Sequence, residues 1–310
     1  MSAMDRRYFL GSMTLATLAP NAFCGAVSSE KKPSKNTRPP LCIFSKHLQF
    51  MSVPEMAKAC RSLGLDGIDL TVRDGGHVAT EEVVEALPLA VDQIRAEGLE
   101  VPMITTLFCS SSDPGFSEVV ATAAQCGISF MRIGNHKYRR GEAIQSQLKS
   151  ISEELRAMAH IAEVHGMRMG YHNHSGINNV GAPMWDLYQI FEDNQPMSLG
   201  SNLDAAHALV ESPLGNWRIA ARLLAPRVHM VSLKDFTFTG NYPQWTSLGK
   251  GVLNVPAFLA LLREEADFSG PISLHFEHKT ANAEALLKEI GQAVAYMRTT
   301  GLPESGYVQG

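Results

Sequence analysis

Strand-like and helix-like segments alternate regularly along this chain from residue 41 onward. Eight short, mostly apolar runs are typical of buried strands, and they cover residues 41–44, 67–72, 99–105, 129–133, 167–171, 198–204, 227–233 and 271–277. The stretches between them are helix-like, and several end in Gly, which is common just past a helix C-terminus. Eight strands that alternate with helices over about 260 residues predict an α/β fold, the closed (β/α)8 TIM barrel.

A doubly wound open sheet is the alternative fold for such an alternation. That fold places a Gly-rich phosphate-binding turn after its first strand, and "LCIFSKHLQF" contains no glycine there. We therefore predict a single barrel domain over residues 41–300, followed by a C-terminal tail over residues 301–310.

The composition limits the partners that the chain can have. Its 310 residues are 45% hydrophobic, which is enough for an ample core, and the formal charge of −4 gives no basic surface for nucleic acid. Beyond the first 27 residues no apolar run reaches the roughly 18–20 residues of a membrane span. We expect a small-molecule partner, and the sequence does not specify an oligomeric state.

The first 26 residues have the features of an export signal. Arg6-Arg7 precede "YFL" and a weakly apolar stretch that ends in small residues, which resembles a twin-arginine signal with cleavage after Ala26. A polar linker with several prolines then fills residues 27–40. This predicts a periplasmic protein. A lipid anchor at Cys24 is the alternative, and the large Phe23 before it argues against an anchor.

Ionisable residues follow the ends of three predicted strands. Because side chains alternate along a strand, "PISLHFE" directs Ser273, His275 and Glu277 inward when its apolar residues face the helices. The same alternation directs Asp204 inward in "SLGSNLD", and it directs His172 and His174 inward in "YHNH". The carboxyl ends of barrel strands carry the active sites of TIM barrels.

These residues are of the types that bind divalent metals. We predict a site for Mn²⁺, Co²⁺ or Zn²⁺ at His172, Asp204 and Glu277. His207 follows Asp204 by three residues and is the expected fourth ligand. One such residue is more often structural, but several buried ionisable groups at three strand ends would each cost stability without a function.

Six segments carry a resemblance to a known family: "CIFSKHLQF", "GLDGIDLTVRDGGHV", "LDAAHA", "SLKDF", "LGKGVLNVPAF" and "GPISLHFEH". Through them, residues 41–298 resemble the xylose-isomerase-like TIM barrels known as sugar phosphate isomerases and epimerases. That superfamily also includes D-tagatose 3-epimerases, inosose dehydratases and endonuclease IV. The extra zinc-binding histidines of endonuclease IV are missing here, so the resemblance implies a sugar substrate.

The resemblance implies four metal ligands: Glu, Asp, His and Glu after strands five to eight. Asp204 and Glu277 match two of them, whereas His172 stands where the first Glu is expected and Ser232 where the His is expected. Three histidines are candidates to replace the missing ligand: His207, His174 and, if its strand is bulged, His229. By simple alternation His229 faces the helices instead.

These differences bear on the expected reaction. The family's epimerases use two metal-bound glutamates to move a proton on the carbon next to a carbonyl. In this chain His172 stands in place of one of these two glutamates. "YHNH" is similar to the "YHHH" of inosose dehydratases, which eliminate water next to a ketone. Both reactions begin with proton removal α to a carbonyl, for which we expect Glu277 or His172 as the base and Lys234 as the cation that stabilises the enolate.

Three functions remain open from the sequence. The first is a metal-assisted isomerase or epimerase of a sugar, which the export signal predicts to be unphosphorylated. The second is a lyase or hydratase that acts on a keto-sugar or a 3-keto-glycoside. The third is a barrel that binds carbohydrate without catalysis. The expected substrate contacts are side chains of cationic, aromatic or imidazole type: Lys46, Arg73, Tyr138, His174, Trp245 and His275.

Overall fold

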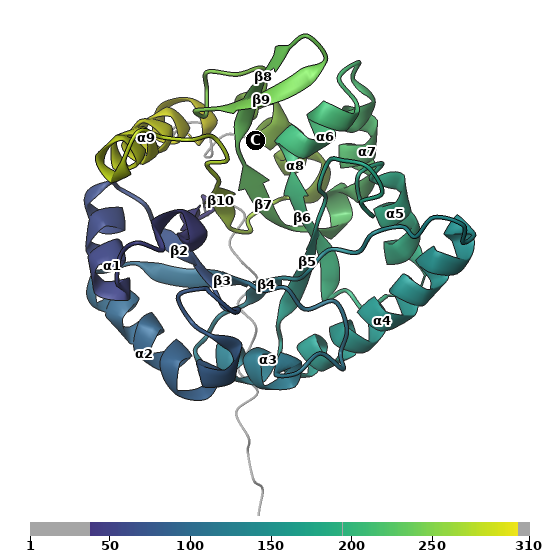
Figure 1. The fold of residues 1–310 in the computed structure, drawn as a ribbon, viewed down its shortest axis with the longest axis horizontal. Helices are drawn as coiled ribbons and strands as arrows, with labels where there is room; N and C mark the ends of the chain where they lie inside the picture. The colour runs from purple at the N-terminus through teal and green to yellow at the C-terminus, as the bar shows by residue number, and fades with distance from the viewer. Residues whose placement is uncertain (1–37, 194, 303–310) are drawn as a thin grey trace, which may run out of the picture. The chain divides into compact units, whose positions relative to one another are not determined.

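Eight parallel strands close into a barrel at the centre of the fold (Figure 1). The computed structural model describes residues 38–193 and 195–302. Around the barrel the strands pair in the order β1-β10-β7-β6-β5-β4-β3-β2. Their bounds are Leu41–Phe44 (β1), Gly67–Thr71 (β2), Glu100–Thr105 (β3), Phe130–Arg132 (β4), Arg168–His172 (β5), Leu199–Asp204 (β6), Val228–Leu233 (β7) and Ile272–Leu274 (β10). The closed barrel confirms the predicted fold and excludes the open doubly wound sheet.

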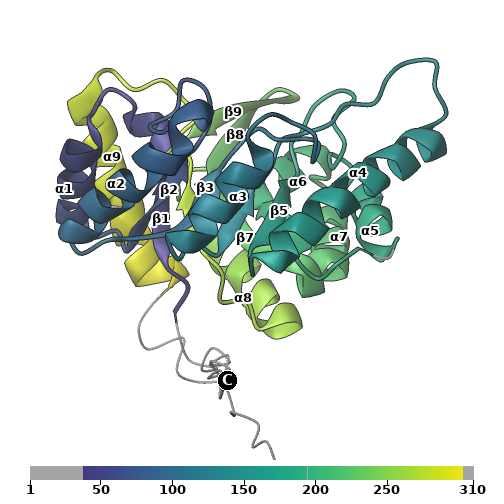
Figure 2. The ribbon, with the colours of Figure 1, turned by 90° about the horizontal axis from the view of Figure 1, so that it is seen from below.

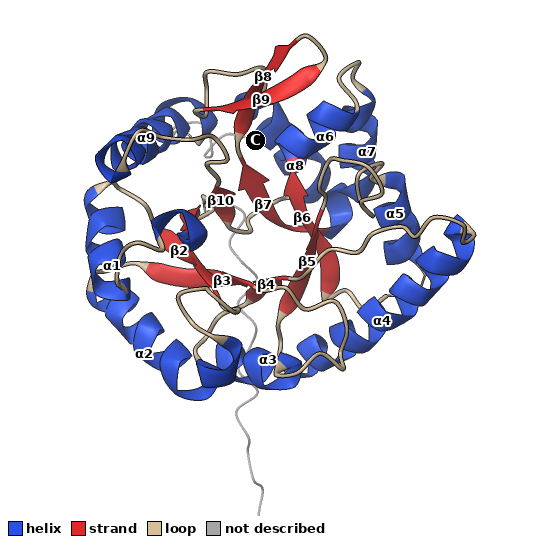
Figure 3. Ribbon diagram, in the orientation of Figure 1, coloured by secondary structure: helices blue, strands red, loops and turns tan. Residues whose placement is uncertain are grey.

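Helices surround the barrel and connect its strands (Figure 3). They are α1 (Val53–Ser62), α2 (Val83–Ala96), α3 (Phe116–Gln125), α4 (Ile144–Val164), α5 (Trp185–Glu192), α6 (Ala205–Glu211), α7 (Asn216–Leu224), α8 (Val255–Ala266) and α9 (Ala283–Tyr296). Shorter helical turns are η1 (Ser45–Leu48), η2 (Thr80–Glu82), η3 (Ala225–Arg227) and η4 (Met297–Gly301). In the described part of the chain no helix has the length and apolar character to cross a bilayer.

The predicted export signal lies outside the described residues. The same holds for most of the predicted linker, through residue 37, and for residues 303–310 of the predicted tail. The described chain enters β1 directly from residues 38–40.

Side-chain capping explains where several helices begin. Ser52 and Glu55 form a capping box before α1, in which the Ser52 backbone N–H donates to Glu55 Oε2 at 2.8 Å. The side chains of Asn254 and Asn282 accept from backbone N–H groups in the first turns of α8 and α9. Each cap satisfies an N–H that has no partner within the helix and stabilises the helix by about 1 kcal/mol.

Alternation within the strands divides an apolar layer from a polar interior. Met169, Tyr171, Ile272 and Leu274 are buried in the layer between strands and helices. Inside the barrel, buried Asp69 accepts hydrogen bonds from Thr105 Oγ1 and Ser273 Oγ, both at 2.7 Å. Burial raises the pKa of Asp69 to about 6, although these two hydrogen bonds oppose the shift.

A two-stranded hairpin follows β7 and was not predicted from the sequence. It pairs β8 (Asp235–Thr239) with β9 (Tyr242–Thr246) and lies at the upper side of the barrel in Figure 2. The buried Asp235 carboxylate holds the next loop, because it accepts from the backbone N–H groups of Gly249, Gly251 and Leu253 at 2.9–3.1 Å. A Cβ at Gly251 would lie 2.1 Å from Asp235 Oδ1, so this loop requires glycine.

Candidate active site

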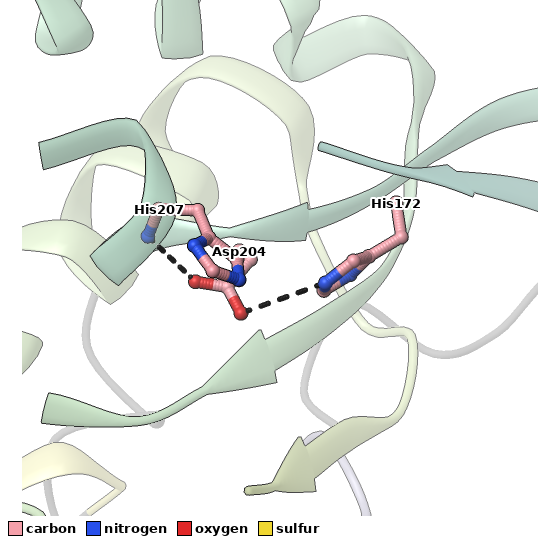
Figure 4. Close-up of side chains that lie close together, drawn as sticks. All are labelled: His172, Asp204 and His207. Atoms are coloured by element: carbon pink, nitrogen blue, oxygen red, sulfur yellow. Dashed lines mark hydrogen bonds and ion pairs between the residues drawn. The ribbon is translucent and has the colours of Figure 1, made fainter. Parts of the chain in front are cut away.

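Three of the predicted site residues meet at the carboxyl ends of β5 and β6 (Figure 4). His172 is the last residue of β5, Asp204 is the last residue of β6, and His207 lies in the first turn of α6. Each offers a ligand atom, and these atoms all lie within 4.8 Å of one another. All three residues are buried, with exposures of at most 1%. We call these three residues the cluster.

Asn173 explains why the two histidines of "HNH" flank an asparagine. Its buried side chain bridges β5 to β6: Asn173 Oδ1 accepts from the Asp204 N–H at 2.7 Å, and Asn173 Nδ2 donates to the Asp204 carbonyl at 2.9 Å. Asp204 in turn caps α6, because its Oδ1 accepts from the His207 N–H at 2.9 Å. The cluster is therefore fixed by backbone hydrogen bonds at two strand ends.

The tautomer of His207 follows from its two partners. Lys234 Nζ lies 2.7 Å from His207 Nε2, and because an ammonium only donates, Nε2 is the acceptor. His207 Nδ1 then carries the proton and donates to Ser175 Oγ at 2.7 Å. Burial, followed by the charge of Lys234, lowers the pKa of His207, which keeps the ring neutral. The ring of His174 packs against it with centroids 3.9 Å apart.

Lys234, for which the sequence predicted a cationic role, lies beside the cluster. Its side chain is 1% exposed, and Nζ lies 2.9 Å from Asp204 Oδ2 and 2.6 Å from Glu277 Oε1. The centroid of the Trp245 ring, from β9, lies 5.0 Å from Nζ, which is suited to a cation–π contact. The buried ammonium thus has two carboxylates, one imidazole and one aromatic face around it.

His172 and His275 each keep one ring nitrogen without a partner. His172 Nδ1 and His275 Nε2 are buried and make no hydrogen bond to any residue that the structure describes. Burial is the main cause that lowers the pKa of both rings, and the charges of Arg132 and Lys234 lower it further. Two neutral imidazoles with free nitrogens are suited to contact a ligand, because buried polar groups without partners are rare.

Glu277 lies at the site but outside the cluster. Strand β10 ends at Leu274, so the alternation that predicted a metal-ligating Glu277 does not extend to this residue. Its side chain is 32% exposed and bonds Lys234. Partial burial would raise the pKa of Glu277, but the charge and hydrogen bond of Lys234 prevail and lower it, so the carboxylate is ionised at neutral pH.

The remaining predicted contacts are distributed unevenly. His174, His275 and Trp245 lie around the cluster and Lys234. Lys46 is exposed after β1, and Tyr138 donates its hydroxyl to Asp186 Oδ2 at 2.8 Å. His229, the alternative ligand if its strand were bulged, lies away from the cluster and places Nδ1 3.0 Å from the carbonyl of Met169. Burial lowers the pKa of His229 to about 4.

Arg132 and Phe44 were missed by the sequence analysis. The guanidinium groups of Arg132 and Arg73 each lie 5.6 Å from the centroid of the Phe44 ring, and His275 stacks on that ring at 4.7 Å. Arg132 is the one charged residue in "SFMRI" and the last residue of β4, and a charge at a strand end was the available signal. Arg73 also lines a cavity of about 650 Å³ beside the loops after β2 and β3.

The cluster fits a divalent cation by donor type and spacing. Two imidazoles and a carboxylate are ligands that Mn²⁺, Co²⁺ and Zn²⁺ accept, and the three donors lie close enough to share one ion. The histidine that the family resemblance implies after the seventh strand is replaced by Ser232, which donates to Asn202 Oδ1 inside the barrel. The site can therefore be described as a candidate metal site with three protein ligands.

Comparison with known families agrees with this geometry. The sequence of residues 57–300 matches the family described as xylose isomerase-like TIM barrel. The chain belongs to this family. The xylose isomerase-like fold accounts for the closed barrel and for the location of the site at the strand ends. Among curated proteins, none matches the sequence.

Several solved structures share the xylose isomerase-like fold. The IOLI protein, solved with a bound zinc atom, has a TM-score of 0.71 at 15% identity, with 87% of this chain and 100% of that chain covered. The 3-keto-D-glucoside 4-epimerase of E. coli has a TM-score of 0.67 at 14% identity, with 84% and 100% covered. A probable 3-DHS dehydratase of Bacillus anthracis has a TM-score of 0.66 at 15% identity, with 84% and 98% covered. At identities this low, the structural similarity shows a common fold and nothing more.

Proposed function

We propose that this protein is an enzyme that removes a proton from the carbon next to a carbonyl of an unphosphorylated sugar. The observation that carries the proposal is the buried Lys234 ammonium, which contacts the Glu277 carboxylate at 2.6 Å at the mouth of the barrel. A carboxylate that accepts protons and a cation that stabilises an oxyanion are the two groups that enolisation requires.

Each residue then has a distinct task. Glu277 is ionised and partly open to solvent, so it can accept the α-proton. Lys234 stabilises the negative charge that develops on the carbonyl oxygen. His172 and His275 hold sugar hydroxyls through their free ring nitrogens. Trp245 offers an aromatic face to the sugar ring beside Lys234.

A divalent cation fits the donor types of the cluster as an alternative to Lys234 as the source of positive charge. Held by His172, Asp204 and His207, it would act as a Lewis acid toward the substrate's oxygen when bound. We propose Mn²⁺, Co²⁺ or Zn²⁺, and the zinc in the IOLI protein supports zinc among them.

Isomerisation or epimerisation is the outcome that membership of the family favours, and elimination is the alternative. His172 is a neutral imidazole on the β5 side, where a symmetric two-carboxylate mechanism would need a second ionised base. This favours a lyase that expels a group from a keto-sugar or 3-keto-glycoside. The cavity of about 650 Å³ beside Arg73 offers room for the second group of a glycoside. The similar structures support both outcomes, because one is an epimerase and another a probable dehydratase.

Product analysis tests the proposal. Purified protein is incubated with a panel of free ketoses and 3-keto-glycosides, and the products are identified by NMR. A new epimer or ketose supports isomerisation, and an unsaturated sugar with a released aglycone supports elimination. Saturable binding without any product across the panel would support a non-catalytic carbohydrate-binding barrel instead.

We also propose that the protein is exported to the periplasm through its Arg6-Arg7 leader. Export supports an unphosphorylated substrate, since sugar phosphates are scarce outside the cytoplasm. Replacing Arg6-Arg7 by Lys-Lys should retain the protein in the cytoplasm in a fractionation experiment. Unchanged export of this variant would contradict a twin-arginine route, and a lipid-modified N-terminus would indicate an anchor at Cys24.

A further inference from the structure

The ammonium of Lys234 engages the atoms that a metal ion at the cluster would need. Nζ lies 2.9 Å from Asp204 Oδ2 and 2.7 Å from His207 Nε2. It also lies 2.6 Å from Glu277 Oε1, so three donor atoms surround one buried positive charge.

Asp204 and His207 each have one further side-chain atom that could bind a metal, and both of these atoms already form hydrogen bonds within the protein. Asp204 Oδ1 accepts from the His207 backbone N–H, and His207 Nδ1 donates to Ser175 Oγ. The atoms left for an ion are therefore Asp204 Oδ2 and His207 Nε2, which are the two that Lys234 contacts. A divalent cation bound to both would lie beside a buried like charge and would have to displace it.

From this overlap we infer that Lys234 and a divalent cation compete for one position. Lys234 is the cation that the protein carries in its own sequence, and divalent metals bind the wild-type site weakly. Removing the ammonium while keeping an unbranched apolar stem that ends at Cε converts the same residues into a tighter metal site. The catalytic consequence rests on the proposed function: wild-type turnover requires no added metal, because Lys234 supplies the charge next to the oxyanion.

Metal titration of the full-length protein tests this inference without any substrate. After treatment with a chelator and its removal, Zn²⁺ and Mn²⁺ are titrated calorimetrically into wild type and Lys234→Met. Two unit charges about 4 Å apart interact strongly even at an effective dielectric constant near 20, so we expect Lys234→Met to bind on the order of 100-fold more tightly than wild type. The matched control is Lys279→Met, an exposed lysine after β10, which should bind as wild type does.

A second variant locates the gained site. Adding Asp204→Asn to Lys234→Met should abolish most of the gain, because it removes the charge of a ligand. Equal affinities of wild type and Lys234→Met would overturn the inference, as would a stoichiometric metal that co-purifies with wild type and resists the chelator. The latter measurement needs no variant, so it holds even if Lys234→Met does not fold. Turnover by wild type from which metal has been removed supports metal-independent catalysis. Absence of turnover both with and without metal would count against the proposed function and leaves the metal-binding result unaffected.

Discussion

The imidazole rings of His172 and His275 face each other across the barrel, with centroids 6.1 Å apart and planes 21° from parallel. His172 ends β5 and His275 directly follows β10, and these two strands are not neighbours, since β6 and β7 lie between them. Burial lowers the pKa of both rings, and one nitrogen of each has no partner among the described residues. A sugar that reaches these nitrogens would meet two neutral hydrogen-bonding groups, where the family resemblance implied a carboxylate at His172.

Replacing His172 by Glu should distinguish the two outcomes of proton removal. If the enzyme is an epimerase that tolerates His172, the new carboxylate preserves or raises epimerase activity on a free ketose. If His172 is required for elimination, the substitution lowers kcat for a 3-keto-glycoside on the order of 10²-fold or more, as loss of a positioned acid or base does. Both substrates are assayed with both proteins. A lyase activity that is unchanged in His172→Glu would refute the idea that this histidine defines the chemistry.

Glu277→Gln should abolish turnover while leaving the fold intact. The amide keeps the shape of the side chain but cannot accept the α-proton, so we expect kcat to fall by about 10²–10⁴-fold. The matched control is Glu284→Gln, an exposed glutamate in the first turn of α9, which should retain wild-type kcat. Steady-state kinetics measures kcat of both variants, and circular dichroism checks that both are folded. Full activity of Glu277→Gln would show that another residue is the catalytic base.

Asp69 should make stability fall as the pH rises. Its pKa is raised from 3.8 to about 6 in the folded protein, so folding favours the protonated form. The contribution of this group is therefore fully present below about pH 4 and is lost as the pH rises through 6, by about 2–3 kcal/mol. Asp69→Asn removes the titration, so its stability relative to wild type should improve by that amount between pH 4 and 7. Urea unfolding across this range measures the difference, and a difference independent of pH would contradict the assignment.

Gly251→Ala should destabilise the protein through the loop that Asp235 holds. The added Cβ would lie 2.1 Å from Asp235 Oδ1 and 2.3 Å from the carbonyl of Phe236. Overpacking of this kind costs roughly 1–3 kcal/mol. Gly291→Ala in helix α9 is the control, since its new Cβ would meet only Leu63 at 3.3 Å and the change should be within about 1 kcal/mol. Thermal unfolding of both variants is the measurement, and equal stabilities would show that the loop adapts.

Strand alternation predicted most of the barrel because each strand has one face toward the helices. The predicted strands agree with the observed ones to within one or two residues, except the last. Strand β10 ends at Leu274, three residues earlier than predicted, and the chain beyond it no longer alternates. For this reason His275 points into the barrel as expected, while Glu277 bonds Lys234 and lies outside the cluster.

The features missed from the sequence depend on contacts between segments far apart in the chain. Arg132 and Phe44 meet through a cation–π contact between β4 and β1, which no local pattern predicts. The β8–β9 hairpin did leave a local signal, since aromatic and polar residues alternate through β8 up to Gly240, whose φ is +61°. Asp69 also had a local sequence signal, because it is the single charged residue within the apolar run "GIDLTV".

Proton exchange with solvent is the most direct test of proton abstraction by Glu277. Wild type and Glu277→Gln are incubated in D₂O with one free ketose and one 3-keto-glycoside, and the signal of the proton next to the carbonyl is followed by NMR. We expect wild type to replace this proton by deuterium, or to remove it by elimination, far faster than Glu277→Gln does. Retention of the proton in a substrate that wild type binds, or equal exchange by both proteins, would contradict it.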